Sequence, residues 1–256
     1  MKILIGVHHF PPKYRGGAEW RAYRTASALR ERGHHASVVC VEQMDADGYP
    51  LSYVDEIFQG VPVRRLSMNL AMAPEPLRWE YDNRWIGEHL QELFAAERPD
   101  LFHLISGYLL TGSALQIAQD AGIPTVLTLT DFWFLCRRIS MLRTDGTIST
   151  LPIDPFRCAR CLGEEKRRFQ WLYHAAPVIM EQYWKAQNTY AGYFAARYDY
   201  LRHVISRVGA VISPSQFLKQ MYVSAQMTAP RMLFLRQGHQ FGSMTPDQLE
   251  KSTSSV

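Results

Sequence analysis

Short runs of apolar residues alternate along this chain with longer segments in which apolar residues recur every three or four positions. The short runs predict buried β-strands, and the recurring pattern predicts amphipathic helices. Strands are predicted at residues 2–7, 36–41, 61–66, 101–105, 125–129, 210–213 and 232–235. Helices are predicted at residues 18–32, 80–96, 109–121 and 214–224, and over 164–208 with a break near Pro177. Strands that alternate with helices in this way favour a parallel sheet with helices on both faces.

Most of the predicted strands are apolar throughout, which is typical of strands buried inside a parallel sheet. Residues 2–41 form a βαβ unit of ordinary length. The predicted fold class is therefore α/β, a Rossmann-like doubly wound parallel sheet. The final segment, residues 242–256, is polar and is predicted to be a loose tail.

Length and composition narrow the class of protein. The 256 residues fit one large domain or two small ones, and 47% hydrophobic with 20% charged residues excludes a disordered chain. The net charge of +4 is weaker than a nucleic-acid-binding protein usually carries, so we expect no nucleic acid partner. The absence of a secretory signal and of a long apolar run, together with only four cysteines, predicts a cytoplasmic protein.

A glycine pair follows the first predicted strand. In open α/β sheets ligands bind beyond the carboxyl ends of the strands, and Gly16 and Gly17 stand there, directly before a predicted helix. Glycines let a phosphate approach the backbone, and the free N–H groups at a helix start favour an anion. A plain turn, with Glu19 favourable to the helix dipole, explains the same residues equally well. The spacing is not the Gly-x-Gly-x-x-Gly pattern of dinucleotide-binding domains.

Three parts of the sequence resemble one known family, the family-4 glycosyltransferases, which have the GT-B fold. The first part is residues 2–7 followed by Phe10-Pro11-Pro12 and Gly16-Gly17-Ala18-Glu19. The second is Ile-Pro-Thr-Val-Leu-Thr-Leu-Thr-Asp-Phe-Trp at residues 123–133, and the third is Val-Ile-Ser-Pro-Ser at residues 211–215. The resemblance covers residues 1–241 and corresponds to the amino-terminal, acceptor-side domain of that family.

The resemblance implies a retaining transfer of a hexose-type sugar from a nucleotide-diphosphate sugar to a glycan or lipid-linked acceptor. In this family the donor binds mainly to a second domain, so we expect residues 1–241 to be the acceptor half and the chain to be inactive alone. Residues 242–256 would then be a tail or linker to an absent donor-binding domain. Gly16 and Gly17 would touch the donor phosphates, and no further cofactor is expected.

The resemblance also implies functional roles for residues at the end of the fifth predicted strand. Many relatives carry at position 130 a histidine that contacts the donor sugar, but this chain has Thr130, which cannot be a cation near neutral pH. We expect Thr130 and Asp131 at the catalytic centre, with Asp131 accepting a hydrogen bond from the acceptor. A helix or turn cap is the alternative for Asp131. Trp133 either stacks on a sugar or fills the core.

Two further residues are expected on the acceptor side of the cleft. His103 stands near the end of the fourth predicted strand and resembles a histidine often found there in the family, although a purely structural role is the alternative. Glu19, in the first turn of the predicted helix after the glycine pair, is the second.

Three cysteines lie close together in the sequence. Cys158 and Cys161 have the Cys-x-x-Cys spacing that suits a tetrahedral thiolate site, and Cys136 precedes them. Because a structural zinc site usually has four ligands, zinc is the minority hypothesis and reduced thiols are preferred. Relatives with a similar Thr-Asp-Phe-Trp stretch tend to have four cysteines here. Cys40 lies inside a predicted strand and is expected in the core.

The positive charge is concentrated in an insert at residues 136–168. This insert has eight arginines and lysines against four acidic residues, a surplus equal to the +4 of the whole chain. A basic loop beside a sugar-transfer cleft could hold an anionic acceptor, such as a lipid phosphate at the inner face of the membrane. Arg137 and Arg138 are the candidates, because the planar guanidinium suits phosphate. A solvated loop without a partner is the alternative.

Two other functions compete with a glycosyltransferase half. One is a non-catalytic module that binds carbohydrate or lipid phosphate. The other is a nucleotide-sugar epimerase or dehydrogenase, which is disfavoured because the dinucleotide fingerprint and a Tyr-x-x-x-Lys pair are both absent from the sequence.

Overall fold

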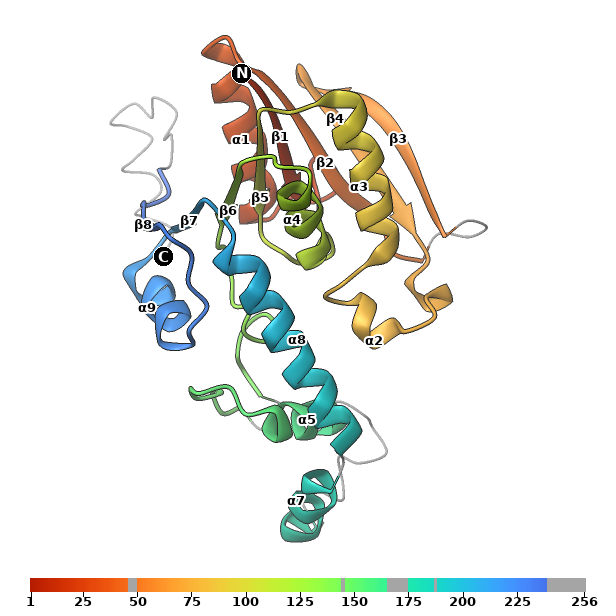
Figure 1. Cartoon of the computed structure of the whole chain (residues 1–256), viewed down its shortest axis with the longest axis vertical. Helices are drawn as coiled ribbons and strands as arrows, with labels where there is room; N and C mark the ends of the chain where they lie inside the picture. Colours follow the sequence, from red (N-terminus) through yellow and green to blue (C-terminus); the bar gives the residue numbers. More distant parts are fainter. Residues whose placement is uncertain (46–49, 144–145, 165–174, 187, 239–256) are drawn as a thin grey trace, which may run out of the picture.

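A computed structural model of the chain describes residues 1–45, 50–143, 146–164, 175–186 and 188–238. Its centre is one eight-stranded sheet with the strand order β3-β4-β2-β1-β5-β6-β7-β8 (Figure 1). Neighbouring strands are parallel except β3 and β4. The predicted fold class, a Rossmann-like doubly wound sheet, is confirmed. The strands are β1 (Lys2–Val7), β2 (His35–Gln43), β3 (Leu51–Phe58), β4 (Val61–Met68), β5 (Leu101–Ile105), β6 (Thr125–Thr128), β7 (Ala210–Ser213) and β8 (Met232–Phe234).

Helices cover the two faces of the sheet unequally. On one face α1 packs over β1, β2 and β4 and buries Ile5, Val38 and Val63. On the other face α3, α4 and α8 bury Leu4, Val39, Phe102 and the side chains around them. The helices are α1 (Gly17–Glu31), α2 (Pro76–Trp79), α3 (Arg84–Glu97), α4 (Thr111–Asp120), α5 (Pro155–Glu164), α7 (Pro177–Lys185), α8 (Asn188–Ser206) and α9 (Gln216–Ser224), with a 3₁₀ turn at Leu70–Met72.

The order of the strands fixes where a ligand can bind. From β1 the chain crosses through α1 to β2 on one side, whereas β5 starts a succession that runs to β6, β7 and β8 on the other side. The loops that leave the carboxyl ends of β1 and β5 therefore diverge and open a crevice, the usual ligand position in open α/β sheets. In Figure 1 the N-terminus lies at the top, and α5 and α7 extend below the sheet.

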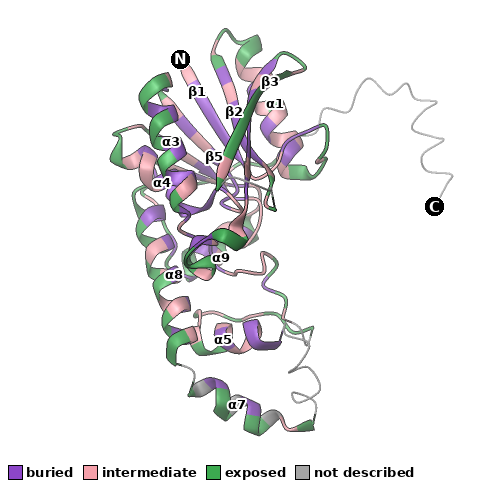
Figure 2. Ribbon diagram, turned by 90° about the vertical axis from the view of Figure 1, so that its right-hand side faces the viewer, coloured by how far each residue is buried: buried purple, intermediate pink, exposed green. Residues whose placement is uncertain are grey.

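One strand and several helix boundaries differ from the sequence prediction. The prediction missed β3, an edge strand whose residues are exposed or partly exposed throughout, because a strand without a buried face has no apolar alternation (Figure 2). β3 joins β4 through Gln59 and Gly60, both with positive φ, which is the backbone of a tight hairpin turn. The helix predicted at 80–96 begins later, because the Asn83 side chain accepts the Ile86 N–H and caps α3.

The region predicted as one broken helix, 164–208, is organised differently. The structure places α7 and α8 there and adds α5 before it, while residues 165–174 lie outside the described part. α5 and α7 pack through Trp184, whose ring lies so close to Gly163 that a side chain at that position would collide with it. No helix among the described residues is long and apolar enough to span a membrane.

Candidate functional site

The first part of the site lies between the end of β1 and the start of α1. β1 ends at Val7, which places His8 beyond the sheet, and His8 Nε2 lies 3.1 Å from Glu19 Oε1 in the first turn of α1. A Cβ added at Gly16 would lie 2.4 Å from Glu19 Oε2, so the Glu19 carboxylate would have to shift to admit a side chain there. Gly17 faces open space, with nothing within 4 Å of such a Cβ. Gly17 is the first residue of α1, so the free N–H groups at the start of this helix face a space that a ligand can occupy.

Glu19 is held as an anion. Its side chain is buried, and burial, the largest single cause, acts to raise the pKa. The hydrogen bonds with His8 and with its own backbone N–H, together with the nearby histidines, outweigh burial, so the pKa lies below its ordinary value of 4.5. Glu19 therefore stays charged at neutral pH. The Glu19 carboxylate contacts His8 and lies next to Gly16. Glu19 therefore supports the conformation of the glycine turn.

The second part of the site is the loop that follows β5. Ser106, Leu109 and Thr111 all have positive φ, an uncommon density of left-handed residues in one short loop. Ser106 Oγ donates to Asp131 Oδ2 at 3.0 Å. Thr130 Oγ1 donates to the same oxygen at 2.8 Å, and the Trp133 N–H donates to Asp131 Oδ1 at 2.8 Å.

Asp131 thereby ties the end of β6 to the loop after β5. It accepts three hydrogen bonds, and the Tyr222 hydroxyl donates to its backbone carbonyl at 3.0 Å. The bond from the Trp133 N–H is the turn cap that the sequence left as an alternative. A contact of Asp131 with an acceptor stays a prediction, and it would use a carboxylate whose orientation is already fixed by its neighbours.

The third part is a cavity of about 370 Å³ beside these loops. Tyr108 lines it and also makes an edge contact with the ring of His8, with centroids 5.7 Å apart. Arg137 lines it too, and its guanidinium binds Glu80 through two hydrogen bonds of 2.5 and 2.8 Å. The lining residues are Met44, Leu70, Trp79, Glu80, Asn83, Tyr108, Leu109, Thr111, Trp133, Arg137, Arg138, Ile139 and Arg197.

Arg197 supports one wall of this cavity from beneath. It is buried on α8 and donates to the backbone carbonyls of Trp133 and Phe134, and its guanidinium lies 5.1 Å from the centre of the Trp133 ring. Trp133 is itself only 3% exposed. The Trp133 side chain is therefore mainly part of the core, with one edge left on the cavity.

His103 does not belong to the same side of the sheet as Trp133, Arg137 and Arg138. Along β5, Phe102 and Leu104 face α3 and α4, so His103 between them faces α1. Its Nε2 lies 2.8 Å from Thr128 Oγ1, and it stands inside the strand, two residues before the end of β5. The residues that the sequence predicts at the acceptor therefore lie on two sides of the sheet, because strand side chains alternate between the faces.

Burial, with a smaller contribution from the charge of Arg21, lowers the pKa of His103 from 6.5 to about 4. Between these two values the unfolded chain binds a proton more readily than the folded protein. Lowering the pH from 6.5 to 4 should therefore cost about 2 kcal/mol of the free energy of unfolding. Urea unfolding of the wild type and of His103→Gln at several pH values in this range measures the effect.

The His103→Gln protein should lose this part of the pH dependence, whereas His203→Gln, at an exposed position of α8, should keep it. If the pH dependence of His103→Gln equals that of the wild type, the imidazole of His103 is not shielded from water in the folded state.

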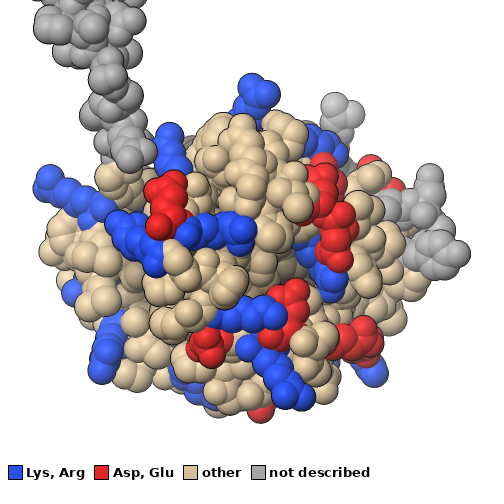
Figure 3. Space-filling model, turned by 90° about the horizontal axis from the view of Figure 1, so that it is seen from above, with Lys and Arg blue, Asp and Glu red and all other residues tan. Residues whose placement is uncertain are grey.

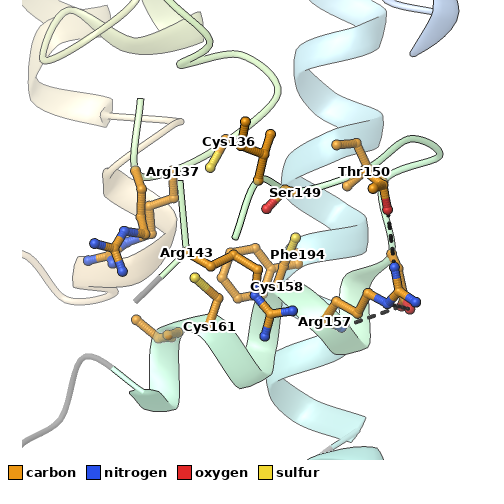
Figure 4. A pocket seen from close by; sticks show the side chains of 14 residues that line it. Cys136, Arg137, Arg143, Ser149, Thr150, Arg157, Cys158, Cys161 and Phe194 are labelled. Carbon is orange, nitrogen blue, oxygen red and sulfur yellow. Dashed lines mark hydrogen bonds and ion pairs between the residues drawn. The ribbon is translucent and has the colours of Figure 1, made fainter. Parts of the chain in front are cut away.

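The three cysteines of the insert line one pocket, together with Arg143, Arg157 and other residues (Figure 4). Burial raises the pKa of the Cys158 thiol to about 12, and it raises the pKa of Cys161 against the opposing hydrogen bond from Arg138. Both thiols are therefore protonated at neutral pH in the metal-free protein. No group of three or more possible ligands suited to a metal ion occurs among the described residues. Cys40 is buried in the core, as expected.

Four of the five arginines that the structure describes in the insert contact acidic side chains. Arg143 and Arg160 both contact Glu164, and Arg157 contacts Asp154. Arg137, which precedes them, is paired with Glu80 from outside the insert. The arithmetic of the sequence does not show these contacts, and an anionic acceptor at Arg137 and Arg138 stays a prediction. Lys166, Arg167 and Arg168 lie outside the described residues. At the upper end of the molecule, too, basic and acidic side chains are interspersed (Figure 3).

Comparison with known proteins gives the family. A family described as "Glycosyl transferase 4-like domain" matches residues 16–238, which include the glycine turn, the loop after β5 and the Thr130–Asp131 pair. The chain belongs to this glycosyltransferase family. The predicted resemblance is therefore confirmed, and with it the assignment to the glycosyltransferases of GT-B fold. A search of curated proteins finds no match.

Among solved structures, the glycosyltransferase 4-like chain is similar to sucrose-phosphate synthase from Thermosynechococcus elongatus, with 12% identity over 100% of this chain and 53% of that one and a TM-score of 0.49. It is also similar to an alpha,alpha-trehalose-phosphate synthase (UDP-forming) from Burkholderia vietnamiensis, with 10% identity, 99% and 54% coverage and a TM-score of 0.46. The chain spans about half the length of these two proteins.

His8, Ser106 and Tyr108 are site residues that the sequence analysis did not predict. His8 directly follows the first predicted strand and Ser106 directly follows the fourth, and in a parallel sheet these ends meet at one edge. The positions of His8 and Ser106 relative to their strands would have been sufficient to propose these two residues.

Proposed function

We propose that this glycosyltransferase 4-like chain forms the acceptor-binding half of a retaining enzyme that transfers a hexose-type sugar from a nucleotide-diphosphate sugar to a glycan or lipid-linked acceptor. The observation that supports it best is the cavity lined by Trp79, Tyr108, Trp133 and three arginines. Aromatic rings offer apolar faces for a sugar, and polar groups between them give orientation. Tyr108 connects this cavity to the His8–Glu19 pair and hence to the glycine turn.

In this proposal each part has one task. The backbone N–H groups at Gly16 and Gly17 bind the donor phosphates, where the positive end of α1 favours an anion. Thr130 and Asp131 hold the loop after β5 and place the acceptor hydroxyl. Trp133, Arg137 and Arg138 border the acceptor. A second, donor-binding domain would complete the enzyme.

Gly17→Ala tests the donor side. A Cβ at Gly17 meets nothing within 4 Å in the protein, and alanine favours a helix start over glycine, so the variant should fold with unchanged or slightly higher stability. The same Cβ would stand where a phosphate approaches the backbone. We expect affinity for a nucleoside diphosphate, such as UDP or GDP, to fall about tenfold, equivalent to about 1.4 kcal/mol. Isothermal titration calorimetry measures it.

Gly192→Ala is the matched control, because this glycine on α8 also faces open space and lies away from the glycine turn. It should bind the nucleotide like the wild type. If the chain binds glycans but no nucleoside diphosphate, the non-catalytic carbohydrate-binding module is the better description. Equal nucleotide affinity of Gly17→Ala and the wild type would show that the phosphates do not contact this turn.

A further inference from the structure

One face of α1 carries a row of arginines. Arg21 and Arg24 lie on this face, and Arg32 follows as the residue that caps the C-terminal end of α1. With Arg15 before the helix and Arg236 after β8, they line a groove of about 550 Å³, here called the arginine groove. Its other lining residues are Gly16, Gly17, Trp20, Thr25, Ala28, Leu29, Gln237 and Gly238.

The arginine groove has no acidic lining. No ion pair joins any of its five arginines to an acidic side chain within the part of the chain that the structure describes. Arg15 and Arg32 donate only to the backbone carbonyls of Pro12 and Ala28. Arg21 Nη1 is buried and has no hydrogen-bond partner among the described residues.

This pattern is the opposite of that in the insert, where Glu164 and Asp154 compensate the arginines. A buried donor without a partner destabilises the protein, and an incoming anion would supply the missing acceptor. Five guanidinium groups of one sign around a groove also attract a multiply charged ligand more strongly than a single phosphate would require.

The dimensions of the groove favour a chain-like ligand. α1 has 15 residues and is therefore about 22 Å long. One end of the groove is the Gly16–Gly17 turn, where we propose that the donor phosphates bind, and Arg32 marks the other end. A ligand that follows the arginines would lead directly into the proposed transfer site.

The side chains between the arginines favour a glycan over a nucleic acid. Proteins that bind single-stranded nucleic acid combine a basic groove with several aromatic rings on which successive bases stack. Here Trp20 is the single aromatic residue among those that line the groove. One tryptophan fits the apolar face of one sugar ring, and the planar guanidinium fork fits carboxylate, sulfate or phosphate groups on the neighbouring sugars.

We propose that the arginine groove binds an anionic glycan, a chain of sugars with acidic groups along it, whose end reaches the Gly16–Gly17 turn. This rests on the proposed function and specifies its acceptor class. The acidic groups pair with Arg24 and Arg32 near the exposed side of α1 and with Arg21 at the base of the groove.

The test compares two hexasaccharides of equal length by isothermal titration calorimetry, hexagalacturonate as the acidic chain and maltohexaose as the neutral one. The wild type should bind hexagalacturonate at least tenfold more tightly. In the Arg24→Ala/Arg32→Ala double variant, affinity for hexagalacturonate should fall at least tenfold, and the slope of log Kd against log salt should decrease by roughly two. Arg24 and Arg32 are exposed, so thermal unfolding should be unchanged.

Three controls make the result specific. Arg84→Ala removes an exposed arginine on α3, outside the groove, and should leave hexagalacturonate binding unchanged. The Arg24→Lys/Arg32→Lys variant should recover most of the affinity. Polyphosphate that competes with hexagalacturonate in the wild type but not in the double alanine variant would support the groove as the anion site.

Equal affinity for the two hexasaccharides, or unchanged hexagalacturonate binding in the double alanine variant, would overturn the proposal. So would an oligonucleotide that binds the wild type more tightly than hexagalacturonate does. The proposed function is tested separately, because it fails when Gly17→Ala leaves nucleotide binding unchanged, and that result does not depend on the charge of the glycan.

Discussion

Replacing Arg65 with alanine is expected to lower the free energy of unfolding by about 3–4 kcal/mol. Arg65 lies on β4 with its side chain only 9% exposed and contacts Glu42 at 2.9 Å and Glu56 at 2.7 Å. It also donates to the carbonyls of Phe10 and Pro11, in the loop between β1 and the glycine turn. The substitution leaves two carboxylates and two carbonyls without their shared donor. Urea unfolding at neutral pH measures the loss.

The neighbouring Arg64 is the matched control for Arg65. It also makes a two-bond ion pair, with Asp55 at 2.6 and 2.7 Å, but the Asp55 side chain is 56% exposed. Exposed pairs contribute little, so Arg64→Ala should cost less than about 1 kcal/mol. If both variants lose the same stability, the burial of Arg65 is not what makes its contacts important. Because Arg65 holds the loop before Gly16, Arg65→Ala should weaken nucleotide binding as well.

The second large effect is expected for Gly107→Ala. A Cβ at this position would lie 2.5 Å from ring atoms of both Trp133 and Phe134, two buried side chains that cannot withdraw without opening the core. Overpacking of this kind costs about 3 kcal/mol. Because Trp133 lines the proposed acceptor cavity, we expect acceptor binding to fall together with stability. Thermal and urea unfolding measure the first effect and glycan titration the second.

Gly192→Ala separates the clash from the general effect of adding a methyl group. This glycine lies inside α8 with nothing near it, so alanine there should stabilise the protein by about 0.5–1 kcal/mol. Should Gly107→Ala prove as stable as the wild type, the loop after β5 would not pack against Trp133 and Phe134 as described.

The prediction of the fold from the sequence succeeded where burial leaves a pattern. β1, β5 and β7 were predicted with their observed boundaries, because strands covered on both faces are short continuous apolar runs. The prediction failed for elements whose burial leaves no apolar pattern in the sequence. β3 has no buried face. α5 lies in the insert, whose arginines and cysteines were interpreted as possible ligand-binding residues and not as part of a helix.

Some residues of the candidate site were located correctly from the sequence, and others were not, because a sequence pattern does not show which face of the sheet a residue occupies. The sequence brought attention to Gly16, Gly17, Thr130 and Asp131, because these residues follow predicted strands and the family motif contains them. It placed His103 with Trp133, whereas the two lie on opposite faces of the sheet. A strand fixes only the alternation of side chains, and the face that each set occupies depends on which helices pack there.

The sequence by itself determined the fold class, the order of most strands, the family and the glycine turn, since all of these follow from local patterns and short motifs. Only the tertiary structure decided which charges are compensated. Arg137 contacts Glu80, 57 residues earlier in the chain, and Arg65 contacts Glu42 and Glu56, whereas Arg24 forms no ion pair with an acidic side chain among the described residues. An ion pair requires two side chains within about 4 Å, and that distance is set by how distant segments pack rather than by their positions in the sequence.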